Sequence, residues 1–298
     1  MTHESKPITR IGFLAHPTRP ETAQIADELA TAARAQGVDV WQRAQWTEDD
    51  TQDLIPGSDM VVSIGGDGAV LHVSRLCAPH HVPVFGVNMG YLGFLTEARP
   101  DKWPTCLGAL LEGRYWVESR LMIQGEIHRD GTCILSEDAL NDVVISRGAQ
   151  AKTVYLSAYI DGQWATNYHA DGLIVATATG STAYALAAGG PILPPELDNI
   201  LMVPVAPHFS MERPVVLAQG VTVKLIISPK TRAETVVTID GRITATLTDH
   251  DEVHVQVSPN RSRFIRLQDR NYFYRSLMER IEPRFATNTP PHEPDSEE

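Results

Sequence analysis

Apolar and polar positions follow two distinct patterns along the first third of the chain. Short apolar runs have the length of buried strands, and apolar residues three or four positions apart between them indicate helices. The predicted strands cover residues 8–15, 38–41, 60–64 and 84–87. The predicted helices cover residues 21–36, 69–78 and 101–112, the last capped by Asp101. This alternation predicts a parallel sheet covered on both faces, with ligands outside the carboxyl ends of its strands.

The pattern changes near Trp116, where the apolar runs become short and rich in β-branched residues. Asp-Gly pairs at 161–162 and 240–241 separate such runs, which is typical of hairpins. The predicted strands cover residues 140–146, 153–160, 221–227, 236–240, 243–247 and 253–257. Helices are predicted at residues 181–188 and 269–280. We therefore predict an α/β protein with a first parallel-sheet domain and a second, mostly antiparallel β-rich domain.

Composition narrows the class of protein. The chain has 298 residues, of which 43% are hydrophobic and 21% charged, so it can bury a substantial core. A net charge of -12 argues against nucleic-acid binding, and no apolar run is long enough to span a membrane. Three cysteines without CxxC spacing indicate reduced thiols, so we expect a cytoplasmic protein with neither a nucleic-acid nor a membrane partner. Residues 283–298, rich in Pro and acid, are predicted to be disordered.

A glycine-rich loop follows one of the buried predicted strands and opens a predicted helix. Its residues are Gly65, Gly66, Asp67 and Gly68. Glycines let the backbone approach an anion, and free N–H groups at a helix N-terminus can bind phosphate. An acid within the loop repels phosphate unless a metal intervenes or unless the acid acts on a hydroxyl proton. The alternative is a tight turn in which Asp67 only caps the helix, and the local sequence leaves both open.

Two further polar features lie in the β-rich part. Residues 171–192 predict a strand, a Gly-Ser-Thr turn and a helix of small residues, so that hydroxyls and amides converge at one helix start. A capped helix packed closely on a sheet is the alternative. Asn141 and Asp142 lie within an apolar strand, where polar side chains need partners such as the ribose hydroxyls of a ligand. Solvation at a strand edge is the alternative there.

These motifs occur together in the order typical of one family. The matching segments are GGDG at 65–68, NMGYLGFLTE at 88–97, LNDVVI at 140–145 and DGLIVATATGSTAYALAAGGPI at 171–192. They resemble the NAD kinase family, and the resemblance extends from about Ile11 to Tyr274. It implies a Rossmann-like, phosphofructokinase-like α/β domain and a β-sandwich-like domain, with a dinucleotide held between them.

The resemblance also implies domain limits, a reaction and partners. The first domain would be residues 1–117 joined by a returning segment 268–282, and the second would be residues 118–267. The γ-phosphate of ATP would pass to the 2′-hydroxyl of the adenosine ribose of NAD, with Mg²⁺ on the donor phosphates. Members of the family are commonly dimers or tetramers, so a homodimer or homotetramer is expected.

The resemblance implies particular roles for individual residues. Asp67 matches the catalytic aspartate, which would orient the acceptor hydroxyl and take its proton. The residues that match binding positions are Gly65, Gly66, Gly68, Phe94, Asn141, Asp142, Asp171, Thr182, Ala183, Tyr184 and, with weaker support, Asp240. His169 is expected to influence which form of the dinucleotide is accepted. No residue is assigned as a metal ligand.

The sequence departs from the family pattern at two positions, and two other functions stay open. Asp142 stands where Glu is usual, which keeps the charge, and Ala178 stands where Pro is usual, which loosens the turn. A lipid kinase of the diacylglycerol or sphingosine type also carries a GGDG loop, but it lacks the 171–192 block in this form. A non-catalytic sensor of NAD or NADP on the same scaffold would be marked by loss of Asp67, which is present.

Overall fold

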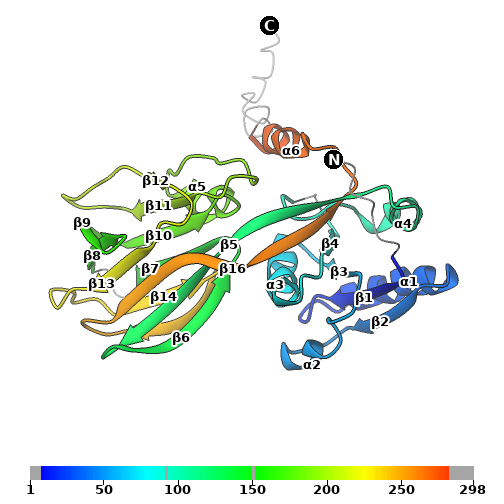
Figure 1. Ribbon diagram of the computed structural model, residues 1–298, viewed down its shortest axis with the longest axis horizontal. Coiled ribbons are helices and arrows are strands. Elements are labelled where there is room, and N and C mark those ends of the chain that lie inside the picture. The colour runs from blue at the N-terminus through cyan, green and yellow to red at the C-terminus, as the bar shows by residue number, and fades with distance from the viewer. Residues whose placement is uncertain (1–7, 91–92, 150–151, 282–298) are drawn as a thin grey trace, which may run out of the picture.

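The computed structural model describes residues 8–90, 93–149 and 152–281, which form two halves joined by a pair of long strands. Figure 1 shows the first half in blue and cyan, with helices around a sheet, and the second half in green and yellow, made largely of strands. The strands β5 (Trp116–Arg129) and β16 (Glu252–Arg266) run side by side from one half into the other (Figure 1). They are antiparallel, with a register shift between Val257 and Arg261.

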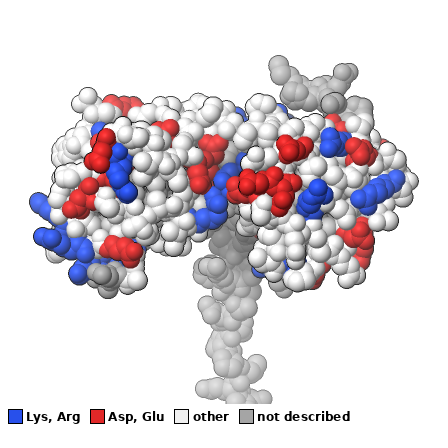
Figure 2. Space-filling view, turned by 90° about the horizontal axis from the view of Figure 1, so that it is seen from below, with Lys and Arg blue, Asp and Glu red and all other residues white. Residues whose placement is uncertain are grey.

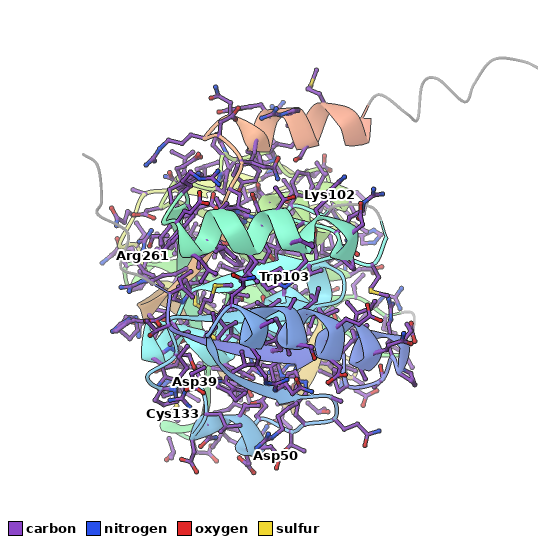
Figure 3. All side chains as sticks on the ribbon, turned by 90° about the vertical axis from the view of Figure 1, so that its right-hand side faces the viewer. Asp39, Asp50, Lys102, Trp103, Cys133 and Arg261 are labelled. Carbon is purple, nitrogen blue, oxygen red and sulfur yellow. The ribbon has the colours of Figure 1, made fainter. Side chains whose placement is uncertain are left out.

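The first half is a parallel sheet with helices packed on it. Its strands lie in the order β2-β1-β3-β4, and every neighbouring pair is parallel. The elements are β1 (Arg10–Ala15), α1 (Glu21–Ala35), β2 (Asp39–Arg43), α2 (Asp49–Gln52), β3 (Met60–Ile64), α3 (Asp67–Cys77), β4 (Val84–Val87) and α4 (Trp103–Leu111). Trp103, which Figure 3 shows between α4 and α1, is buried and donates from Nε1 to the carbonyl of Leu29 at 3.1 Å. Its ring meets Phe13 edge to face, so α4 is held against the sheet.

The second half packs two sheets against each other. One sheet continues from β4 through β16 to β13, β8 and β9, with β5 and β6 at its side, and the other has the order β12-β11-β10-β7-β14-β15. The remaining elements are β6 (Thr132–Ala139), β7 (Asp142–Arg147), β8 (Val154–Ile160), β9 (Gln163–Ala170), β10 (Gly172–Thr177), α5 (Tyr184–Ala187), β11 (Ile200–Val205), β12 (Val215–Leu217), β13 (Val223–Ile227), β14 (Thr235–Ile239), β15 (Arg242–Leu247) and α6 (Tyr272–Ile281). Alternate residues of both sheets, among them Val143, Leu173, Leu225 and Val255, share one apolar core.

Ion pairs cross the junction between the two halves. Arg75 on α3 lies 3.7 Å from Glu137 on β6, and Arg242 on β15 lies 2.8 Å from the same carboxylate. Both arginines also contact Glu48, which precedes α2. Burial opposes the charge of Glu48, yet Arg75 and His72 outweigh it and lower the pKa of that carboxyl. Figure 2, seen from below, shows acidic and basic side chains meeting near the middle of this face.

The predicted fold class is confirmed, because a parallel-sheet domain and an antiparallel sheet domain are both present. Several element predictions were wrong in detail. The strand expected at 253–257 continues to Arg266, and the helix expected at 181–188 is a 3-10 turn (Gly180–Thr182) followed by α5, because the backbone of Ala183 breaks the helix. Asp101 does not cap α4; it lies in a 3-10 turn, and the N-cap residue Lys102 makes no side-chain capping bond.

The domain limits inferred from the sequence stay a prediction, and the limit after residue 117 falls inside β5. The proposed tail at 283–298 lies outside the described residues. Within the described ranges, no helix combines the length and apolar character needed to cross a membrane.

Candidate active site

Asp67 is the first residue of α3 and lies at the carboxyl end of the buried strand β3. Its carboxylate accepts the backbone N–H of Phe94 at 2.8 Å and that of Leu95 at 3.2 Å. The N-cap residue of α3 is Gly66, and no side chain caps the helix. Asp67 is therefore fixed by the segment that follows β4, and the alternative in which it merely caps its own helix is not supported.

Gly93 explains how the segment after β4 can approach the carboxylate so closely. A Cβ atom at position 93 would lie 1.7 Å from Oδ1 of Asp67, so only a hydrogen fits there. The N–H of Gly93 donates to Oγ1 of Thr96 at 2.6 Å, which fixes the turn from its other side. The position of Asp67 thus depends on a residue without a side chain in a neighbouring loop.

A buried group of charged residues supports the same segment from behind. We call Glu97, Glu118, Arg120, Arg266 and Tyr272 the arginine cluster; all five are buried. The Arg266 guanidinium donates to Glu118 at 2.9 Å and to Glu97 at 3.2 Å. It also donates to the carbonyl oxygens of residues 94 and 95, at 3.3 and 3.2 Å. The two residues whose N–H groups hold Asp67 are therefore also held through their carbonyls by Arg266.

Charge is balanced within the arginine cluster. Burial opposes ionisation of Glu118, but Arg120 and Arg266 outweigh it and hold the pKa of that carboxyl below its usual range. Burial likewise opposes the charge of Arg266, yet its acidic and phenolic neighbours raise its pKa further. Tyr272 on α6 donates from its hydroxyl to Glu118 at 2.8 Å, which ties the last helix to the cluster. Glu118 and Arg266 therefore stay ionised while buried.

A second group brings two acids together, one buried and one half-buried. We call Asp142 and Asp240 the acidic pair. Asp240 accepts three backbone N–H groups, from Leu140 at 2.9 Å, Asn141 at 2.8 Å and Asp142 at 3.1 Å. Burial, together with the neighbouring Asp240, raises the pKa of Asp142 to about 7. Burial also raises the pKa of Asp240, because it outweighs the three N–H donors and the charge of Arg75.

The turn after β10 packs directly on Asn141. The N–H of Thr177 donates to the carbonyl of Asn141 at 2.9 Å, and a Cβ atom on Gly180 would lie 2.1 Å from that same oxygen. Arg120 of the arginine cluster reaches Oγ1 of Thr179 at 3.5 Å. The loops that carry Asp67, Asn141 and the Gly-Ser-Thr turn therefore meet at one place, where the parallel sheet faces the β-rich half.

Known proteins resemble this chain in sequence. Residues 11–115 match the ATP-NAD kinase N-terminal domain, and residues 140–267 match the ATP-NAD kinase C-terminal domain. An NAD kinase of Ectopseudomonas mendocina is 41% identical over 240 residues, covering 76% of this chain and 81% of that protein. One from Pseudomonas savastanoi is 44% identical over 215 residues, covering 72% and 73%. The chain belongs to the NAD kinase family.

Solved structures extend the likeness beyond sequence. An NAD kinase from Archaeoglobus fulgidus in complex with ATP has a TM-score of 0.70 at 25% identity and covers 90% of this chain and 97% of its own. The yeast NADH kinase complexed with NADH has a TM-score of 0.82 at 24% identity, covering 93% and 88%, which shows the shared fold. The resemblance to the NAD kinase family predicted from the sequence is therefore confirmed, and so is the predicted class of phosphotransferase.

The structure brings most of the residues predicted from the NAD kinase motifs together. Gly65, Gly66 and Gly68 surround Asp67 at the start of α3. Thr182 donates to the carbonyl of Thr179 at 3.1 Å in the turn beside Asn141, followed by Ala183. The side chain of Tyr184 is 47% exposed, and Phe94 packs its ring near that of Phe273 on α6 at 6.0 Å. The ligand-binding roles of all these residues stay predictions.

Two of the predicted residues lie elsewhere. Asp171 precedes β10, whereas the Gly-Ser-Thr turn follows it, so about 17 Å of strand separates Asp171 from Ala176, the partner of Asp142. Asp171 pairs with Arg147 at 3.1 Å. His169 stacks on Tyr155 with ring centroids 4.1 Å apart and contacts Thr153. Both residues lie before β10, whereas the Gly-Ser-Thr turn follows it, and their predicted roles in binding remain predictions.

Residues that position the site were missed by the sequence patterns. Gly93 was only one letter of the 88–97 motif, and Arg266 and Tyr272 were not singled out. A charged residue inside an apolar run such as Phe264–Leu267 was the available signal, because a buried charge requires a partner. The sequence could not show that this partner lies 148 positions away at Glu118.

Proposed function

We propose that this chain transfers the γ-phosphate of ATP to the 2′-hydroxyl of the adenosine ribose of NAD, giving NADP and ADP. The observation that supports it most is the fixed carboxylate of Asp67 at the carboxyl edge of the parallel sheet. Relatives named NAD kinase at 41% and 44% identity support the same reaction. We further propose that the enzyme is cytoplasmic and acts as a homodimer or homotetramer.

Asp67 is proposed as the residue that orients the acceptor hydroxyl and takes its proton. Phosphoryl transfer needs accurate positioning and charge neutralisation more than covalent chemistry. The two N–H groups at positions 94 and 95 fix the plane of the carboxylate, so it can accept a hydrogen bond from the ribose without first reorganising. The arginine cluster holds the carbonyl oxygens of the same two residues, which makes the arrangement rigid.

The dinucleotide is proposed to lie across the start of β7 and the Gly-Ser-Thr turn. Asn141, Asp142 and Thr182 line this region, and Tyr184 exposes a ring beside it. The acidic pair supplies acceptors for ribose hydroxyls or for exocyclic amines of a base, which would offset the cost of burying two carboxyls. The roles of Phe94, His169, Asp171 and Asp240 in binding are proposed on the same sequence motifs.

A divalent metal, which we propose to be Mg²⁺, fits this site as a companion of ATP. Mg²⁺ is usually held by one or two carboxylates together with the phosphates of the substrate. Asp67 provides a carboxylate at the loop, and no cage of three His, Cys, Asp or Glu side chains surrounds it among the described residues. When bound with ATP, the ion supplies neutralisation of charge on the donor phosphates.

The test is a coupled assay in which purified protein, ATP, Mg²⁺ and NAD are incubated and NADP is read with an NADP-specific dehydrogenase. Asp67→Asn should lower kcat by about 10²- to 10⁴-fold with little change in NAD affinity, because the base is lost while the shape is kept. Asp59→Asn is the matched control. Asp59 also accepts two backbone N–H groups, at 2.7 and 3.0 Å, but it lies at the opposite end of β3.

The outcomes separate the competing functions. Near-normal kcat in Asp67→Asn would remove Asp67 from the proposed role. Absence of NADP formation by the wild-type protein would overturn the reaction itself, and phosphorylation of diacylglycerol or sphingosine would then favour the lipid kinase. Tight NAD binding without turnover would favour the sensor. Inorganic polyphosphate in place of ATP, and NADH in place of NAD, define the donor and acceptor range.

A further inference from the structure

The outer face of the β5–β16 ladder carries four side chains that the proposed reaction does not use. Glu126 and His128 lie two positions apart on β5, and Glu252 and His254 lie two positions apart on β16. The register places Glu126 opposite His254 and His128 opposite Glu252. The residues between them on both strands point into the core of the second half, so these four side chains share the outward face.

The four side chains are already close to one another. Nε2 of His128 lies 3.0 Å from Oε2 of Glu126, and Nε2 of His254 lies 2.7 Å from Oε2 of Glu252. The two imidazoles are stacked, with centroids 4.3 Å apart and planes inclined by 19°. One ligand atom each from Glu126, His128 and His254 fall within 4.8 Å of one another. In the described parts of the chain, this is the one group of three or more such side chains so closely gathered.

We propose that Glu126, His128 and His254 bind one divalent transition-metal ion of the Zn²⁺ type, with Glu252 or water in the fourth position. Zn²⁺ binds imidazole nitrogen and carboxylate oxygen at about 2.0 to 2.2 Å, so ligand atoms around a tetrahedral ion lie roughly 3.3 to 3.5 Å apart. Rotation of these partly exposed side chains that shortens the separations of their ligand atoms by up to about 1.5 Å brings the three atoms to that spacing. A set of two imidazoles and a carboxylate favours Zn²⁺, Co²⁺, Ni²⁺ or Cu²⁺ over the oxygen-seeking Mg²⁺ and Ca²⁺.

Access and charge suit such an ion. A hollow of ≈ 290 Å³ lies beside the group and is lined in part by Glu126, Lys224 and His254, so solvent ions reach it. Nζ of Lys224 lies 3.5 Å from Oε1 of Glu252 and compensates that carboxylate. Glu126 has the imidazole of His128 as its partner and is the carboxylate best placed to neutralise a metal ion.

A metal ion here would connect the two strands that run through both halves of the molecule. It would bind without ATP or NAD, because none of its ligands belongs to the proposed active site. Since the unfolded chain does not hold these residues together, binding favours the folded state in proportion to the metal concentration. The site is therefore a structural clamp on the β5–β16 ladder.

The experiment measures Zn²⁺ binding to nucleotide-free wild-type protein by competition with a chromophoric chelator, together with Tm with and without Zn²⁺. We expect one ion per chain and a rise in Tm on adding Zn²⁺. His128→Gln and His254→Gln should each weaken binding by at least about tenfold, since loss of a ligand exceeds loss of a residue that only supports one. The visible absorption of the Co²⁺ form should show four-coordinate geometry in the wild type and lose it in both variants.

The matched control is Gln124→Ala with Gln256→Ala. These residues pair at 3.3 Å on the same face of the same two strands, but they are not part of the ligand set. The control should keep Zn²⁺ affinity and the rise in Tm, and the histidine variants should keep wild-type turnover and wild-type Tm without Zn²⁺. The proposal is overturned if the wild type takes up no Zn²⁺, if His128→Gln with His254→Gln binds it unchanged, or if the control loses it equally.

Discussion

The arginine cluster and the acidic pair are both groups of charged residues largely removed from solvent near the same site, but they differ in charge balance. The arginine cluster combines two glutamates with two arginines and a tyrosine, and its members satisfy one another. The acidic pair has two carboxyls held by backbone N–H donors, and the charge of Arg75, which favours ionisation of Asp240, does not outweigh the effect of burial. The first has the properties of a scaffold that is complete without a ligand, whereas the second carries a cost that a ligand can relieve.

The balance of the arginine cluster predicts the largest effect. Arg266→Met would leave Glu97 and Glu118 buried without their shared partner, which typically costs about 3 to 5 kcal/mol in the free energy of unfolding. Urea-induced unfolding at pH 7.5 measures it. Arg114→Met is the control, because its pair with Glu112 at 2.6 Å is exposed and should contribute less than about 1 kcal/mol. Equal losses in the two variants would show that burial and balance do not distinguish these pairs.

The unbalanced charge of the acidic pair predicts an effect of opposite sign on the free energy of unfolding, because a substitution there stabilises the protein. The pKa of Asp142 is about 7 in the folded chain, whereas an unfolded Asp has a pKa of about 3.9. Between these values the folded state holds a proton that the unfolded state has released, so this group makes the free energy of unfolding fall as pH rises from about 4 to 7. Asp142→Asn removes that dependence and should stabilise the free protein at pH 8 by roughly 2 to 4 kcal/mol.

Urea unfolding of wild type and Asp142→Asn at pH 4.5 and pH 8 tests this difference. The two proteins should be nearly equal at the lower pH and diverge at the higher, and parallel pH profiles would show that Asp142 titrates normally. The same change should raise the KM for NAD if the pair serves the dinucleotide, so that stability is gained where binding is lost.

The two groups also explain which parts of the molecule the sequence could predict. Strands with clean alternation, such as 154–160 and 223–227, were predicted nearly to the residue. β5 was missed, because Glu118 and Arg120 interrupt its apolar pattern although both are buried. The end of β16 was missed because the polar residues 258–263, which include a proline, interrupt the apolar pattern after Val257. In a sequence pattern, a buried charged residue is interpreted as a surface residue unless its distant partner is known.

The residues of the candidate site differ in the same way: some could be predicted from local sequence and others could not. Asp67 and the Gly-Ser-Thr turn were recognisable because each is a local motif in which glycine or hydroxyl residues determine a turn. The contact of Arg266 with residues 94 and 95 spans about 170 positions and has no local signature. Asp171 lies before the first residue of β10, whereas the turn that contacts Asn141 follows the last. Their separation is therefore set by the direction of the strand, which the spacing of the motif does not show.

The smallest effect concerns how α6 joins the arginine cluster. The hydroxyl of Tyr272 donates to Glu118 at 2.8 Å and accepts from Arg266 at 3.1 Å, so Tyr272→Phe removes a charge-assisted contact but leaves both ion pairs of Arg266 in place. A loss of about 1 to 2 kcal/mol in the free energy of unfolding is expected, well below that of Arg266→Met. Tyr274→Phe, in the same helix but 54% exposed, should change nothing measurable.

Hydrogen exchange makes the last comparison sharper than stability alone. If the Tyr272 hydroxyl fixes α6, amides of residues 273–278 should exchange faster in Tyr272→Phe while those of β5 and β16 keep their protection. If exchange rises instead along β5, the hydroxyl supports the scaffold itself, and the arginine cluster is less complete without Tyr272 than its paired charges indicate. Phe273 packs near Phe94, so a looser α6 should also lower turnover slightly through the segment that holds Asp67.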